Sequence, residues 1–133
     1  MNSLDTNVLV YAVSELDGPK ETAAKLLLSE ALHGSWPIAA QVYGEFYSVM
    51  TRKNYMSRID ARAAIQTYLE LMPALPSSLT AHAAALKLAT ERQIQYWDAL
   101  IIAVCAENGV KKLYSEDLPG SRKPLGVRCV EPW

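Results

Sequence analysis

Apolar residues recur every three or four positions over most of this chain, which is the spacing that places them on one face of an α-helix. The pattern predicts helices over residues 19–32, 41–52, 61–72, 78–93 and 96–108. Gly34 is expected to cap the C-terminus of the first of these helices, and Pro73 stops the third. Ser57 and Asp60 resemble a weak capping box before the third helix.

Shorter apolar stretches lie between these helices and have the length of β-strands. They cover residues 4–10, 36–40, 112–115 and 127–130, and the stretch 116–126 between the last two is expected to be rich in turns. The first is expected to be a short strand that ends at a turn, followed by a short helical or extended piece. Short strands that alternate with longer helices predict an α/β fold with a parallel sheet, in which ligands bind at the carboxyl ends of the strands.

The stretch YWDALIIAVCA, residues 96–106, is apolar on every side after Asp98. A helix with no polar face is normally buried, so Asp98 is expected near or inside the protein. A buried carboxylate is unfavourable unless it is hydrogen-bonded, paired or bound to a metal. This carboxylate therefore needs a partner from another part of the chain. Tyr96 and Trp97 are expected to be packing residues that fix the start of the helix.

Length and composition narrow the class of protein. The chain has 133 residues, of which 50% are apolar and 20% charged, as expected for a single globular domain over residues 1–133. It lacks a signal-peptide pattern and any apolar run of membrane-spanning length, so we expect a cytoplasmic protein that does not contact the membrane. Cys105 and Cys129 are expected to be reduced packing residues.

The formal net charge of −1 does not itself predict a nucleic-acid-binding protein. Four acids nevertheless occupy positions that could converge: Asp5 and Asp117 after strands, Glu45 at the border of an apolar helical stripe, and Asp98 at a helix start. Clustered carboxylates repel one another, and their oxygen atoms suit Mg²⁺ or Mn²⁺. Such a centre is suited to phosphodiester hydrolysis, because the metal can activate water and stabilise the leaving oxygen.

Each acid also has a simple structural explanation. Asp5 could form an Asx-turn or a helix N-cap, and Asp98 could cap its own helix. Glu45 could be a solvated border residue, while Glu116 and Asp117 could be ordinary turn acids. No single acid decides between these alternatives.

Four segments in this order, LDTNVLVYA, AAQVYGEFYSVM, YWDALIIAVCAENG and KKLYSEDLPG, resemble the PIN-domain family, and most closely its VapC-type ribonuclease toxins. The resemblance implies a three-layer α/β/α domain with a mostly parallel central sheet. It also implies an endoribonuclease with an acidic pocket that binds Mg²⁺ or Mn²⁺. The first strand of the family is usually a longer apolar run, so the strand before Asp5 must be short here.

The resemblance assigns the four acids of the family to Asp5, Glu45, Asp98 and Asp117. Asp5 and Asp98 would be direct metal ligands, and Asp117 would complete a second or outer metal shell. Glu45 would orient or deprotonate the attacking water. Glu116 is the alternative for the place of Asp117.

The hydroxyl positions of the family fall on Thr6 and Ser115, which would hold waters around the metal or a phosphate oxygen. The resemblance further implies a homodimer, a small VapB-like antitoxin that covers the pocket, and a structured RNA substrate. Three tyrosines could serve a protein interface or belong to the core: Tyr43, Tyr47 and Tyr68. The densest basic stretch could contact RNA phosphates or form a solvated helix face, and its residues are Arg52, Lys53, Arg58 and Arg62.

Three other classes of protein share part of this pattern. An aspartyl phosphatase commonly has a second aspartate two positions after the first, where this chain has Asn7. A phospho-receiver domain has an acidic pair after its first strand, and the pair is absent here. A catalytically degenerate PIN-like module that binds RNA or protein is the remaining alternative, and the presence of all four acids argues against it.

Overall fold

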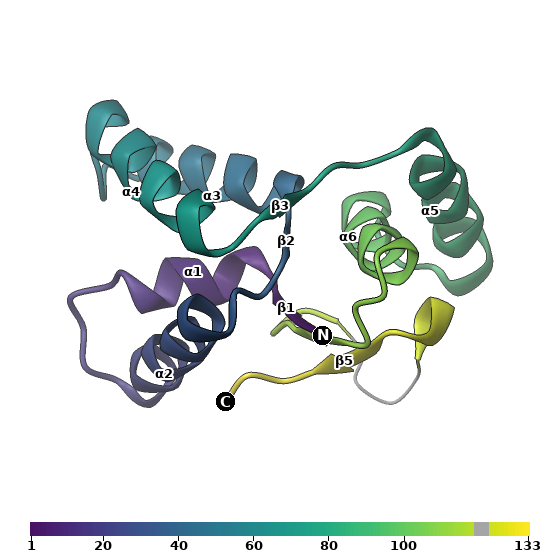
Figure 1. Cartoon of the computed structure of the whole chain (residues 1–133), viewed down its shortest axis with the longest axis horizontal. Coiled ribbons are helices and arrows are strands. Elements are labelled where there is room, and N and C mark those ends of the chain that lie inside the picture. Colours follow the sequence, from purple (N-terminus) through teal and green to yellow (C-terminus); the bar gives the residue numbers. More distant parts are fainter. Residues whose placement is uncertain (119–122) are drawn as a thin grey trace.

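The computed structural model describes residues 1–118 and 123–133. This part of the chain forms six α-helices, one 3-10 helix and five short strands (Figure 1). The α-helices are α1 Thr6–Ala12, α2 Pro19–Gly34, α3 Ala40–Arg52, α4 Arg58–Leu71, α5 Leu79–Arg92 and α6 Tyr96–Glu107. The strands are β1 Asn2–Leu4, β2 Ile38–Ala39, β3 Ala74–Leu75, β4 Lys112–Tyr114 and β5 Arg128–Val130, and the 3-10 helix η1 is Pro124–Gly126.

The strands pair in parallel throughout. Strands β1, β4 and β5 form one group in that order, and β2 pairs with β3 in a second. The Ser3 hydroxyl of β1 donates a buried hydrogen bond of 2.6 Å to the Pro37 carbonyl just before β2, which joins the two groups. Leu4 stands opposite Tyr114, so the carboxyl ends of β1 and β4 lie side by side.

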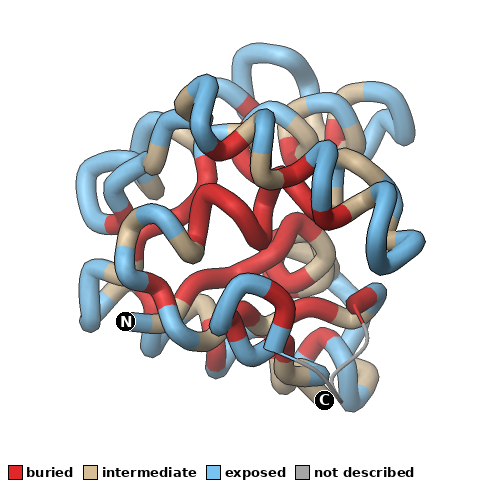
Figure 2. Tube along the Cα trace, turned by 90° about the vertical axis from the view of Figure 1, so that its right-hand side faces the viewer, coloured by how far each residue is buried: buried red, intermediate tan, exposed pale blue. Residues whose placement is uncertain are grey.

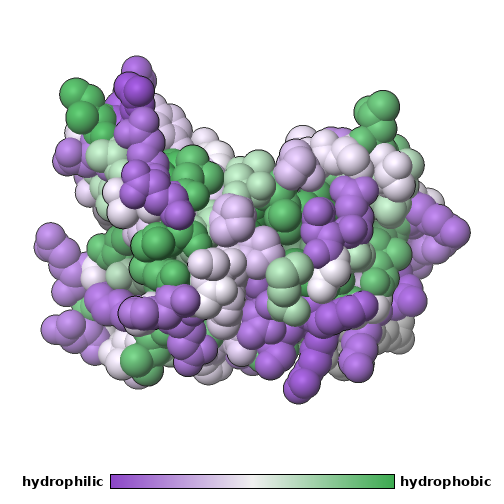
Figure 3. Space-filling model, in the orientation of Figure 1, coloured by the Kyte–Doolittle hydropathy of each residue, from purple (hydrophilic) through white to green (hydrophobic). Residues whose placement is uncertain are grey.

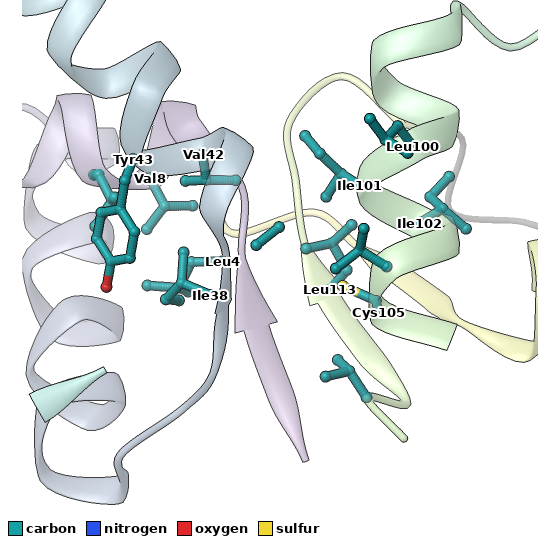
Figure 4. Packing of buried hydrophobic residues seen from close by; sticks show 14 of the residues in the cluster. Leu4, Val8, Ile38, Val42, Tyr43, Leu100, Ile101, Ile102, Cys105 and Leu113 are labelled. Atoms are coloured by element: carbon teal, nitrogen blue, oxygen red, sulfur yellow. The ribbon is translucent and has the colours of Figure 1, made fainter. Parts of the chain in front are cut away.

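Helices lie on both sides of the strands, with α1 and α2 on one side and α5 and α6 on the other (Figure 1). Figure 4 shows Leu4 near Ile38, Val8 and Val42 on one side of β1, and Ile101 of α6 on the other side of the strand. Buried backbone occupies the centre of the molecule and exposed backbone its periphery (Figure 2). The predicted three-layer α/β/α fold with a parallel sheet is therefore confirmed.

Helix α6 is buried along most of its length, as its apolar sequence predicted. Residues 99–105 are all buried. The two cysteines are also buried and free, and burial raises the pKa of the Cys105 thiol to about 12 and that of Cys129 to about 11. Both thiols stay protonated at neutral pH and act as packing residues, as predicted. No helix in the described ranges has the length and apolar character needed to cross a membrane.

Several boundaries differ from the prediction for local reasons. Strand β1 ends at Leu4, and the residues that follow form helix α1 because the Asp5 side chain caps it. Gly34 is the last residue of α2, and the left-handed cap is Ser35 at φ 52°. A Cβ atom at Gly34 would lie 2.8 Å from the Trp36 indole nitrogen, so glycine is needed there for close approach.

Of the two alternatives for Tyr43, the structure supports the core. Tyr43 is only 5% exposed, and its hydroxyl donates a 2.8 Å hydrogen bond to the Met72 carbonyl. The prediction that Trp97 is a packing residue at the start of α6 is wrong, because this side chain is 53% exposed. Part of the turn-rich stretch expected at 116–126, residues 119–122, lies outside the described residues.

Candidate active site

Asp5 lies at the carboxyl end of β1, next to the end of β4. Its backbone N–H donates to the Tyr114 carbonyl at 2.9 Å, which extends the pairing of the two strands by one residue. Its Oδ1 accepts a hydrogen bond from the Thr6 N–H, and its Oδ2 accepts one from the Ser115 hydroxyl, both at 2.7 Å. Asp5 therefore caps α1, as one of the alternatives held, while its carboxylate is 5% exposed and anchored across the sheet.

Glu45 is brought to the same place by helix α3. Its Oε2 accepts a 2.7 Å hydrogen bond from the Thr6 hydroxyl, and its Oε1 accepts one from Gln41 one helical turn earlier. The Gln41 amide nitrogen also donates to the Trp97 carbonyl at 3.1 Å, which connects α3 to the start of α6. Both carboxylate oxygens of Glu45 are thus held in fixed directions.

In the loop after β4, Glu116 and Asp117 contact different partners. The Asp117 Oδ2 accepts a 2.7 Å hydrogen bond from the Asn7 amide in α1, close to Asp5. Glu116 instead forms an ion pair of 2.8 Å with Lys20 and accepts a 3.0 Å hydrogen bond from the Trp133 indole. Of the two acids, Asp117 is the one connected to the α1 residues around Asp5.

Asp98 is the third residue of α6, and its carboxylate does not cap the helix. The Gln95 side chain caps the helix, because its Oε1 accepts from the Trp97 and Asp98 N–H groups at 3.0 and 3.3 Å. The alternative that Asp98 caps its own helix is therefore wrong.

The four carboxylates lie close enough together that the negative charges of the other acids raise the pKa of Asp5 and that of Asp98. Desolvation is the largest cause that raises the pKa of Asp98 to about 6, and the negative charges of Asp5, Asp117 and Glu45 raise it further. Burial likewise raises the pKa of Asp5, opposed by its hydrogen bonds from Ser115 and Thr6 and reinforced by the other acids. The structure therefore brings together the four acids and both hydroxyls singled out in the sequence.

The acidic cluster has the donor chemistry of a cation site. In the described ranges, however, no group of three His, Cys, Asp or Glu side chains is arranged to hold a metal ion. The carboxylates of Asp5, Glu45 and Asp117 are hydrogen-bonded to neutral donors instead. The ion pair found among the described residues, Lys20 with Glu116, involves none of the four acids. An all-oxygen donor set with unbalanced negative charge has the chemistry that a hard divalent cation requires.

Three polar residues of the site were missed in the sequence. Asn7, Gln41 and Gln95 supply hydrogen bonds to Asp117, Glu45 and the first turn of α6. A signal existed for Gln41, because residues four positions apart on a helix are neighbours and Gln41 precedes Glu45 by four.

Comparisons with known proteins agree with this architecture. A family model described as PIN domain matches residues 3–118, which confirms the resemblance stated from the sequence. Among solved structures, FitAcB from Neisseria gonorrhoeae is 18% identical, with a TM-score of 0.72 over 100% of this chain and 99% of that one. A toxin–antitoxin complex from Klebsiella pneumoniae is 20% identical, with a TM-score of 0.72 over 100% and 98% of the two chains.

VapC20 of Mycobacterium tuberculosis, described as a sarcin–ricin loop cleaving toxin, is 19% identical. Its TM-score is 0.67 over 91% of this chain and 92% of that one. At these identities the likeness establishes a shared fold. None of the curated proteins matches the chain.

Proposed function

This chain belongs to the PIN-domain family, and from that membership we propose that it is a metal-dependent endoribonuclease acting as the toxin of a toxin–antitoxin pair. The observation that carries the proposal is the convergence of Asp5, Glu45, Asp98 and Asp117 without a cationic side chain paired to any of them in the described residues. A purely structural cluster of this kind would be destabilising, because desolvation and mutual repulsion act on the same carboxylates.

Asp5, Asp98 and Asp117 are the residues that would hold Mg²⁺ or Mn²⁺. When bound, such an ion supplies Lewis-acid stabilisation of the negative charge that develops during phosphodiester hydrolysis. Ser115 and Asn7 fix the directions of two of these carboxylates through the hydrogen bonds to Asp5 and Asp117. The site is thus already organised by neutral donors before a cation enters.

Glu45 is the residue that accepts the proton of the attacking water. The hydrogen bonds from Thr6 and Gln41 hold its carboxylate in place. As the water oxygen forms its bond to phosphorus, the bond between phosphorus and the leaving ribose oxygen breaks, and the water proton moves to Glu45. The leaving ribose oxygen takes up a proton from solvent, and Glu45 later releases its proton to solvent. The products are one strand that carries the phosphate and one that carries a free hydroxyl.

The proposed partners follow from the proteins that share the fold. One of them is described as a toxin–antitoxin complex from Klebsiella pneumoniae, and another as VapBC2 of Rickettsia felis bound to a DNA fragment from its promoter. They support the proposal of a VapB-like antitoxin as the partner of this chain. From the family membership we further propose a homodimeric state, a cytoplasmic location and a structured RNA substrate. A small upstream reading frame for a DNA-binding protein would support this assignment, and a solitary gene would oppose it.

The experiment incubates the purified protein with structured RNAs in Mg²⁺ or Mn²⁺, and in parallel with EDTA. We expect internal cuts with either metal, none with EDTA, and none by the Asp98→Asn variant. Cleavage at an equal rate in EDTA or by the variant would refute the metal-dependent mechanism. RNA binding without cleavage in any metal would instead favour the degenerate binding module.

A further inference from the structure

We infer that a groove along α3 binds a single-stranded segment of the RNA, with Trp97 as the platform on which one unpaired base stacks. The inference rests on the proposed ribonuclease function and specifies how its substrate is held. It is carried by two adjoining cavities, an exposed indole at one end and a group of unpaired arginines at the other.

The two cavities form one path. The first, of about 600 Å³, lies between α3 and the start of α6 and is lined by Glu45, Ser48, Arg52 and Trp97, among others. The second, of about 610 Å³, lies at the turn between α3 and α4 and is lined by Ser48, Arg52 and Arg58, among others. Because Ser48 and Arg52 belong to both, the path continues from the acidic site to the α3–α4 turn. In the space-filling view, the surface is hollowed between the α3–α4 and α5–α6 parts of the molecule (Figure 3).

Trp97 is an exposed indole that is held in place from behind. Its side chain is 53% exposed, and the Tyr96 ring packs edge-on against it with centroids 5.0 Å apart. The Tyr96 hydroxyl is hydrogen-bonded to His82 of α5, and the Trp97 carbonyl accepts from Gln41 of α3. An exposed aromatic face that packs on a neighbouring ring beside a carboxylate site is suited to stacking an unpaired base, which is how proteins commonly recognise single-stranded RNA.

An unpaired acceptor belongs to Gln41, which lines the same cavity. The Gln41 Oε1 is buried and has no hydrogen-bond partner among the described residues, while its amide nitrogen serves both Glu45 and Trp97. A buried acceptor without a donor is unfavourable. A turn of this amide toward the cavity would let a base amino group or a ribose 2′-hydroxyl of the bound strand satisfy it, and the 2′-hydroxyl would distinguish RNA from DNA.

The other end of the path is positively charged. Arg52, Lys53 and Arg58 are exposed, and among the described residues none of them forms an ion pair with a carboxylate. Arg52 and Arg58 line the cavities directly and are placed to contact successive phosphates. This charge favours a nucleic-acid strand over a protein partner, and the need for an unpaired base at Trp97 favours a single strand over a duplex.

The test measures binding without cleavage, using the Asp98→Asn protein in EDTA and a fluorescently labelled single-stranded RNA of about ten nucleotides. We expect Trp97→Ala to weaken binding by fivefold or more, since stacking contributes about 1–3 kcal/mol per base. Trp97→Phe should restore most of the affinity because it keeps an aromatic face. Leu86→Ala removes a comparably exposed apolar side chain on α5 and should have no effect.

A base-by-base scan makes the test specific. One abasic position in the RNA should reduce the affinity of the protein that keeps Trp97, and the same position should have no further effect on Trp97→Ala. Arg52→Ala and Arg58→Ala should each reduce the salt slope of binding by about 0.7, whereas Lys87→Ala on α5 should not.

Equal affinities of Trp97→Ala and the Trp97 protein, or an abasic penalty that persists in Trp97→Ala, would overturn the inference. Trp97 would then be better explained as a contact for another protein. Because the assay reads binding alone, a chain that binds in this way but cuts no RNA refutes the proposed ribonuclease and not the stacking site.

Discussion

Removing the charge of Asp98 should stabilise the metal-free protein at neutral pH, although it should abolish cleavage. The pKa of Asp98 is raised from its ordinary value of 3.8 to about 6, so the folded chain binds this proton more tightly than the unfolded chain. Between these two pH values the folded state holds more protons, and the free energy of unfolding therefore falls as the pH rises. The contribution of Asp98 to the free energy of unfolding is fully present below about pH 4. It is lost as the pH rises through about 6, the pKa of this residue in the folded chain.

The magnitude follows from the same difference. The difference between the ordinary pKa of 3.8 and the pKa of about 6 in the folded chain corresponds to a free energy of at most about 3 kcal/mol. Asp98 is only half-buried, so solvent screening reduces this value. Its charge also stabilises the first turn of α6 by about 0.5 kcal/mol, which the substitution removes. We therefore expect Asp98→Asn to gain about 1 kcal/mol at pH 7.5, or about 3–5 °C in Tm.

Asp60 provides a matched control, because it is the third residue of α4 as Asp98 is of α6, and it is exposed and outside the acidic cluster. Urea unfolding in EDTA at pH 7.5 and pH 4.5 should show Asp98→Asn gaining stability mainly at the higher pH, and Asp60→Asn losing up to about 0.5 kcal/mol. A loss of stability in Asp98→Asn at pH 7.5, or an equal gain at both pH values, would refute the repulsion between these carboxylates.

Three further outcomes follow from the contacts. Asp117→Asn should lower RNA cleavage at least tenfold more than Glu116→Gln, since Glu116 is engaged by a lysine and an indole; equal losses in a cleavage assay would contradict this. Ser3→Ala should lower the free energy of unfolding by about 1–3 kcal/mol by orphaning the buried Pro37 carbonyl, whereas the exposed Ser77→Ala should leave it unchanged in urea titrations. Millimolar Mg²⁺ should raise the Tm more at pH 7.5 than at pH 5, because protons compete for the carboxylates; a pH-independent rise in thermal scans would oppose this.

The helices were predictable because their apolar spacing is strong and their caps are local. Ser57 caps α4 through the Asp60 N–H, as the capping-box pattern indicated. The apolar run of residues 99–105 is fully buried in α6, as expected for a helix without a polar face. By contrast, β3 was missed, since two residues directly after Pro73 carry no periodicity and gain their strand geometry only by pairing with β2.

The site was predictable as a set of acids but not as a network. Asp5 and Asp117 each follow a predicted strand. Because parallel strands end on the same side, this predicted both acids at one edge of the sheet. The neutral donors around them depend on which helices meet in space, and no local pattern reports that Asn7 reaches a residue 110 positions away. The exposure of Trp97 was missed for the same reason, since periodicity alone gave no sign that the start of α6 borders a cavity.

The central claim is that four carboxylates act together in one metal-dependent site that cuts RNA. It is tested most directly by single-turnover cleavage of one RNA in Mg²⁺ or Mn²⁺ by Asp5→Asn, Glu45→Gln, Asp98→Asn and Asp117→Asn, with Asp60→Asn as the control. We predict a loss of about 100-fold or more in each of the four variants, at unchanged fold by circular dichroism, and a normal rate for the control. A variant of Asp5 or Asp98 that cuts as fast as the unmodified chain would contradict the account.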